Sequence, residues 1–216
     1  MAITINGTGT ITGISAGGLP DNCITADDLA TTLDLSSNTV TLPSGTGGKI
    51  LQVKTTQYDT ATSISVSGNT WKELPFYVEI TPTSASSRFI VSYQSGGESS
   101  IHNHWNMMSG LGRSNDSGSG FGSISWFEPA SYGSRGPGLG TLSISYPGND
   151  QASTPEQLMV TGYVDDPDTT DVLRYYGGIQ GDSSAFTWYV NRTQDDVNND
   201  AYQRFRSSIT VMEVAD

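Results

Sequence analysis

The chain has 216 residues, with 10 Lys or Arg against 22 Asp or Glu, and a net charge of −12. Contacts to nucleic-acid phosphates need clustered Lys and Arg, so this acidic composition excludes a typical nucleic-acid-binding protein. Only 15% of the residues are charged and 35% are hydrophobic, while Gly, Ser, Thr and Asn are abundant. Such a composition is typical of short strands joined by turns and predicts an all-β protein.

Cys23 is the only cysteine, so an intrachain disulfide is impossible and the fold depends on packing. No apolar run approaches the roughly 20 residues of a membrane helix. The N-terminal sequence MAITINGTGT lacks the basic and apolar regions of a secretory signal. We therefore expect synthesis in a cytoplasm without membrane insertion.

Residues 1–48 differ in composition from the rest of the chain. They contain no aromatic residue and no Lys or Arg, and single aliphatic residues alternate with Thr, Asn and Gly. This pattern fits short strands around the turn NGTG. Thr25 stands three residues before Asp28, an approximate capping box that favours a short helix over residues 26–33, or a solvated turn. The segment cannot bury a core by itself, so it is either disordered or shaped by other chains.

Residues 49–216 show a persistent period-2 pattern of apolar side chains, which predicts about ten strands. The predicted strands are ILQVKTTQY, SISVSG, WKELPFYVEI, RFIVSYQS, IHNHWNMM, TLSISYP, EQLMVTGYV, VLRYYGGI, AFTWYVNR and SITVMEV. Strands of this number, broken by Gly- and Ser-rich turns, indicate a β-sandwich or a jelly roll. We predict long loops over residues 110–120, 129–140 and 192–206, and long loops on a β scaffold often carry binding sites.

Three parts of the sequence resemble structural proteins of tailed bacteriophages. They are SAGGLPDN…ITADDLATTLDLSSNTVTLPSGTGGKILQV at the front, ITPTSASSRFIVSY in the middle and WYVNRTQDD…SSITVMEV at the end. These segments are typical of tail-fibre and tail-tip proteins of aquatic phages, including cyanophages. The stretch from about residue 95 to residue 140 departs from that pattern.

The resemblance implies a protein of the virion tail that forms a homotrimer. Residues 1–48 would intertwine with their copies or dock into other tail or virion proteins, and residues 49–216 would form a head that binds a host cell-surface glycan or protein. Related β-sandwich modules also occur as capsid decorations. A non-adhesive virion protein, such as a capsid decoration or a tail accessory subunit, is therefore the alternative.

Candidate receptor-binding residues lie in or beside the first two predicted loops. An aromatic face next to a guanidinium is a suitable platform for a sugar or an acidic glycan. The candidates are Arg113, Asn115, Trp126, Tyr132 and Arg135.

The motif IHNHW places His102 and His104 on one side of a predicted strand, and a three-fold axis would bring three such pairs together. A transition metal at the trimer axis is one interpretation, supported by metal-binding H-x-H pairs in some phage fibres. The other is a pair of exposed or interface histidines. Apart from this metal, we expect no cofactor.

Catalysis is a further interpretation, because some phage tail proteins cleave glycans with paired carboxylates. Glu128, or Asp165 with Asp166, are the carboxylates available for such a role. Adjacent residues on a strand point apart, however, and the repetitive sequence of a long β-helix is missing. We therefore predict a protein without enzymatic activity and keep a glycan-degrading tail enzyme as the second alternative.

Overall fold

A computed structural model describes residues 49–101, 106–130, 133, 136–144, 153–181 and 184–215. The chain divides into two units, Met1–Gly47 and Gly48–Asp216, and all the described residues belong to the second unit. The short strands and the short helix predicted within residues 1–48 lie outside the described residues. In the described part of the chain, no helix is long and apolar enough to cross a membrane.

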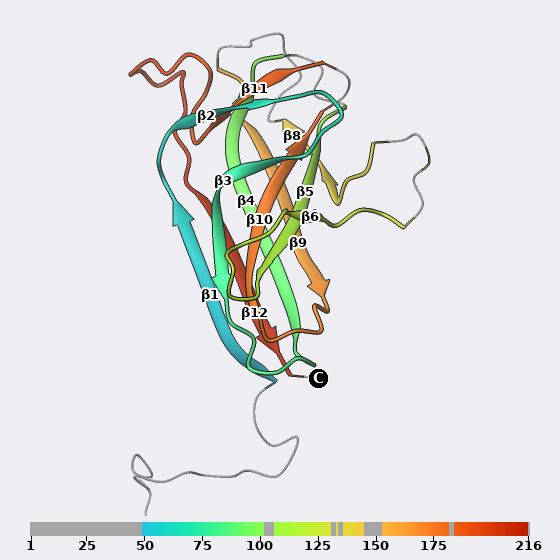
Figure 1. Cartoon of the computed structure of the whole chain (residues 1–216). Coiled ribbons are helices and arrows are strands. Elements are labelled where there is room, and N and C mark those ends of the chain that lie inside the picture. The colour runs from blue at the N-terminus through green and yellow to red at the C-terminus, as the bar shows by residue number, and fades with distance from the viewer. Residues whose placement is uncertain are drawn as a thin grey trace, which may run out of the picture. The chain divides into compact units, whose positions relative to one another are not determined.

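The described residues form antiparallel β-sheets that lie face to face (Figure 1). The seven-stranded sheet contains β1 (Ile50–Tyr58), β2 (Thr62–Val66), β4 (Arg88–Ser99), β8 (Ser143–Ile144), β9 (Glu156–Asp165), β11 (Phe186–Val190) and β12 (Ser207–Val214). The five-stranded sheet contains β3 (Lys72–Ile80), β5 (Met108–Asp116), β6 (Ser125–Trp126), β7 (Gly140–Thr141) and β10 (Val172–Gln180). The prediction of an all-β fold with a β-sandwich architecture is confirmed.

Two long central strands organise the sheets. Strand β4 pairs with β9 along one side, and along its other side it pairs first with β12 and then with β11. In the second sheet, β10 lies between β3 and β5. Strand β1 forms an edge next to β12, and the amide of Ala215 donates a hydrogen bond to the carbonyl of Lys49. Both ends of the described chain therefore lie at the same end of the sandwich.

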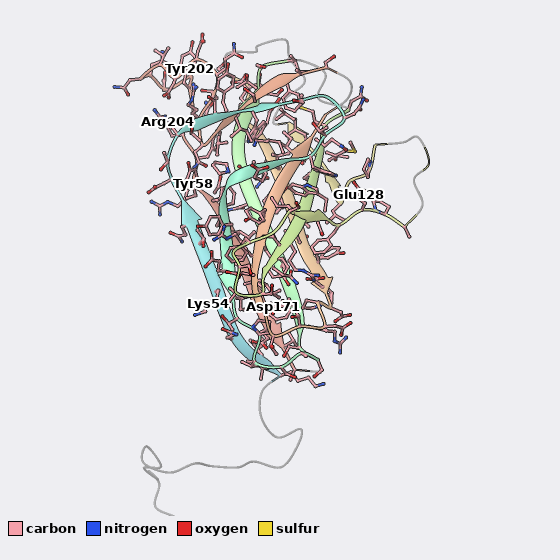
Figure 2. The ribbon with its side chains drawn as sticks, viewed as in Figure 1. Lys54, Tyr58, Glu128, Asp171, Tyr202 and Arg204 are labelled. Carbon is pink, nitrogen blue, oxygen red and sulfur yellow. The ribbon has the colours of Figure 1, made fainter. Side chains whose placement is uncertain are left out.

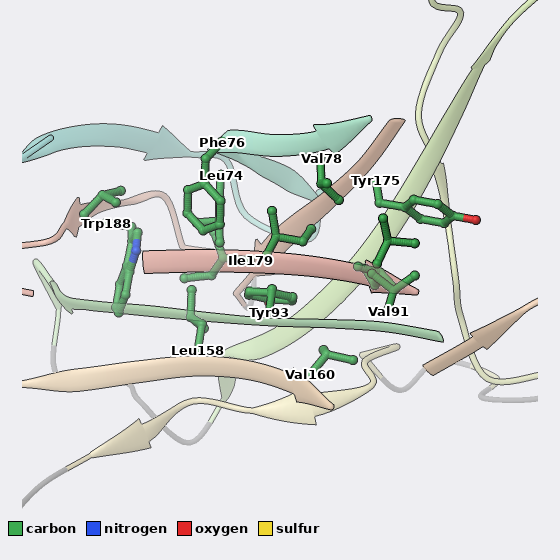
Figure 3. Packing of buried hydrophobic residues seen from close by; sticks show 14 of the residues in the cluster. Leu74, Phe76, Val78, Val91, Tyr93, Leu158, Val160, Tyr175, Ile179 and Trp188 are labelled. Carbon is green, nitrogen blue, oxygen red and sulfur yellow. The ribbon is translucent and has the colours of Figure 1, made fainter. Parts of the chain in front are cut away.

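The core lies between the sheets and follows directly from the alternation of apolar residues. On β3, Leu74, Phe76, Val78 and Ile80 are buried while the residues between them face solvent. They pack against buried side chains from β4, β10, β11 and β12, as Figure 3 shows. Burial of each large apolar side chain contributes about 1.5–3 kcal/mol, so this alternation accounts for much of the stability of the fold.

Residues 110–120 are not the predicted loop, because β5 continues to Asp116 in the middle of the second sheet. The prediction was wrong because Gly110 and Gly112 occupy the outward positions of this strand and hide its alternation. The space over these glycines holds the rings of Trp71 and Trp126, which come from other segments. The apolar pattern of β5 is thus completed by residues distant in the sequence.

Of the strand predicted over residues 101–108, only Met108 belongs to a strand among the described residues, because Asn106 and Met107 precede β5. The strand predicted over residues 141–147 is divided. Strand β7 pairs with β5, whereas β8 pairs with β9 in the other sheet. Buried Leu142 lies at this crossing. One period-2 pattern can therefore span two sheets, since the pattern records burial and not the partner strand.

Candidate functional site

The outer face of the five-stranded sheet carries a group of aromatic side chains that we call the aromatic surface. It consists of Trp71, Tyr77, Phe121, Trp126 and Tyr176 together with Arg174. All of these side chains are partly exposed, and 41% of Tyr77 is accessible to solvent. Apolar atoms are common on protein surfaces, but contiguous aromatic surface often marks a binding site.

Glycines form the floor beneath the two tryptophans. Trp71 lies over Gly110, and Trp126 lies over Gly112 and Gly178, so that a Cβ at any of these glycines would overlap with an indole ring. The indole rings are stacked, with 5.2 Å between centroids and 21° between planes. The indole N–H of Trp71 donates a hydrogen bond of 3.0 Å to Glu128, which is labelled in Figure 2. The glycine floor therefore holds both rings flat against the sheet.

The guanidinium of Arg174 lies between two aromatic rings. Its central carbon is 3.7 Å from the ring centroid of Phe121 and 4.0 Å from that of Tyr77. Its edges donate to Glu79 Oε1 and to the hydroxyl of Tyr176. Burial lowers the pKa of Arg174, because it disfavours the charged form. The hydrogen bonds to Tyr176 and Glu79 outweigh this effect and raise the pKa above its usual value. Arg174 is thus a structural element of the surface, with its faces and its edges occupied.

A tight loop after β5 places Phe121 on Arg174. The carboxylate of Asp116 accepts hydrogen bonds from the amides of Gly118 and Gly120, at 2.7 and 2.8 Å. Both glycines have positive φ, +100° and +94°, a conformation that other residues rarely adopt. The carboxylate of Asp116 therefore holds the loop, and Phe121 has a defined position.

Of the predicted receptor-binding residues, only Trp126 belongs to the aromatic surface. Arg113 points the other way, into the space between the sheets, where it contacts Asp165 at 2.5 Å and Asn115 at 3.1 Å. The hydroxyl of Tyr175 also donates to Asp165, at 2.8 Å. The side chain of Arg113 is only 18% exposed. Arg113 and Asn115 thus belong to a half-buried polar cluster around Asp165 and not to a loop surface.

The remaining predicted site residues, Tyr132, Arg135, His102 and His104, lie outside the described residues. Within the described ranges, no three His, Cys, Asp or Glu side chains form a group able to hold a metal ion. Sequence reasoning missed Tyr77, Phe121 and Arg174. The sequence did indicate that Tyr77 and Arg174 face outward from two predicted strands. That these two strands are neighbours is known only from the order of the strands in the sheet.

A second polar cluster joins three segments beneath the outer edge of the seven-stranded sheet. Glu98 and Glu156 are both buried. Glu98 accepts hydrogen bonds from the amides of Thr154 and Gln194, and Glu156 accepts one from the amide of Ser99. These bonds connect the end of β4 with the start of β9 and with the loop over residues 192–206. Glu156 also lines an open hollow of about 460 Å³.

Comparisons with known proteins identify no relatives by sequence: no protein-family model matches the chain, and neither does any curated protein. Among solved structures, the chain is similar to a chain in the structure of the infectious bursal disease virus Gx strain, with 9% sequence identity and a TM-score of 0.35. The match covers 77% of this chain and 37% of that chain, so this chain spans just over a third of its length. A similarity this low supports no inference about function.

Proposed function

We propose that this protein is a virion structural protein of a tailed bacteriophage, a non-enzymatic tail-fibre or tail-tip subunit that attaches the particle to its host. The phage-like sequence segments support the virion role. The single observation that supports attachment is the contiguous aromatic surface, formed by β3, β10 and the hairpin of β5 and β6. Rigid aromatic side chains provide large contact areas at a low entropic cost.

The geometry favours binding over a purely structural role for this surface. Three glycines, a loop ordered by Asp116 and a guanidinium bonded to Glu79 and Tyr176 all act to hold aromatic rings at a solvent-facing position. A surface organised before binding loses little conformational freedom when a ligand arrives. Rings needed only for stability would be expected in the core, where Phe76 and Trp188 lie.

Replacement of Tyr77 by Ala should weaken binding to susceptible host cells about tenfold or more, since a central aromatic contact typically contributes more than 1 kcal/mol. Tyr77→Phe keeps the ring and should bind within a few-fold of the original protein. The measurement is a titration of fluorescently labelled full-length protein on cells.

Met159→Ala is the matched control, because Met159 is 44% exposed on the seven-stranded sheet. It should leave binding unchanged. Attachment through this surface is wrong if the original protein binds no susceptible cell. It is also wrong if Tyr77→Ala binds the cells as well as Met159→Ala does. The non-adhesive alternative then applies, and labelling of virions followed by electron microscopy would distinguish a tail accessory subunit from a capsid decoration.

The protein should be a homotrimer, and native mass spectrometry should give three times the chain mass of 23.0 kDa. An apolar row on the outer face of the seven-stranded sheet supports contact between copies. Val53 pairs with Met212, Met212 with Ile90, and Ile90 with Val164 across four strands. Val53 and Val164 are 52% and 51% exposed. A monomer at micromolar concentration would contradict this assembly.

A further inference from the structure

We propose that the ligand of the aromatic surface is an uncharged glycan, bound through the apolar faces of its sugar rings, and that anionic polysaccharides are excluded. This inference rests on the proposed attachment function and specifies its ligand. It is carried by the arrangement of the rings along β10 and by the charges that surround them.

The aromatic groups follow one another along the outer face of β10. Trp126 covers Gly178, Tyr176 occupies the next outward position, and Arg174 with Phe121 occupies the one after that. Alternate residues of a strand are about 7 Å apart, so the groups form a strip roughly 14 Å long. A strip of this length and flatness suits an extended chain of pyranose rings, whose C–H faces are apolar.

The cations of the surface are already paired. Arg174 is covered by Tyr77 and Phe121 on its faces and donates to Glu79 and Tyr176 at its edges. The ammonium of Lys72 lies 2.8 Å from the carboxylate of Glu73. Recognition of a carboxylate, sulfate or phosphate on a glycan requires a cation whose hydrogen-bond donors are available. Among the residues that the structure describes, both cations of the aromatic surface already face a carboxylate, so an anionic ligand would have to compete with Glu79 and Glu73 for them.

The border of the surface is acidic instead. Among the described residues, the carboxylates there outnumber the cations Lys72 and Arg174; they belong to Glu73, Glu79, Asp116 and Glu128. The whole chain carries a net charge of −12, which adds long-range repulsion of anions. Carboxylates are strong acceptors for hydroxyl donors, and Glu79 uses only Oε1 toward Arg174. An uncharged sugar supplies hydroxyl donors without a charge penalty.

The test measures binding of the full-length protein to susceptible cells. Periodate oxidation of cell-surface diols should abolish binding, whereas protease treatment should not. An uncharged polysaccharide fraction from the cell envelope should compete, whereas the anionic fraction should not. Binding should change less than about twofold between roughly 0.05 and 0.5 M salt, because it lacks ion pairs across the interface. The residual binding of Tyr77→Ala to cells should no longer be reduced by the uncharged fraction.

Glu128→Gln distinguishes an uncharged ligand from an anionic one, because it removes one negative charge from the border of the surface. The amide oxygen of Gln can still accept the hydrogen bond of Trp71. For an uncharged glycan its affinity should stay within about twofold of the original, whereas an anionic ligand would bind several-fold tighter once this carboxylate is removed. Three outcomes would overturn the inference and leave the attachment function intact. They are competition by the anionic fraction alone, tighter binding of Glu128→Gln, and loss of binding after protease treatment. Absence of any cell binding would instead refute the attachment function.

Discussion

Replacement of Arg113 by Met should lower the free energy of unfolding by about 3–5 kcal/mol, the usual cost of leaving a buried charge without its partner. Asp165 is the group left behind. It is 7% exposed, and it interacts with Arg113 and the hydroxyl of Tyr175 between the two sheets. Equilibrium denaturation with urea, monitored by tryptophan fluorescence, measures the effect.

Arg206→Met is the matched control for this experiment. Arg206 forms a 3.4 Å ion pair with Asp59, but their side chains are 61% and 72% exposed. Exposed ion pairs contribute about 0–1 kcal/mol, so the control should be nearly as stable as the original protein. If Arg113→Met were as stable as the control and lost cell binding instead, the predicted role of Arg113 in receptor recognition would be correct and its structural role wrong.

The protein should become less stable as the pH rises from about 5 to about 8. Burial, with a smaller contribution from the charge of Glu98, raises the pKa of Glu156 to about 8, although the amide of Ser99 opposes the shift. The folded state therefore holds a proton that the unfolded chain, with a carboxyl pKa near 4.5, releases. Stability should fall by about 1.4 kcal/mol for each unit of pH in this window and level off above it.

The variant Glu156→Gln should remove this dependence, because an amide carries no titratable proton and its oxygen still accepts the bond from Ser99. It should resemble the original protein near pH 5 and exceed it in stability at pH 8. Glu128→Gln makes the same chemical change at an exposed position and should leave the slope unaltered. Equal slopes for the original protein and for Glu156→Gln would show that Glu156 is ionised throughout this range in the folded state.

The sequence by itself determined the β class and most of the strands. Strands β1, β3 and β12 were predicted almost to the residue. In β3 and β12 one face is covered by the core, so buried residues alternate with more exposed ones along the strand. This information is local, because the alternation of apolar and polar residues within a strand is enough to show that one of its faces is buried. The strand β5 lacked the signal, since its outward positions are glycines and their cover comes from Trp71 and Trp126.

The aromatic surface was decided by the tertiary structure. Tyr77, Phe121 and Arg174 belong to β3, to the loop after β5 and to β10, and only the sheet order β3-β10-β5-β6 brings them together. Arg113 was expected in a loop, but it lies in β5 and its side chain points inward to Asp165. A period-2 pattern shows that a side chain faces the core or the solvent, but it does not identify the neighbouring strand. Contacts between strands distant in the sequence therefore required the folded chain.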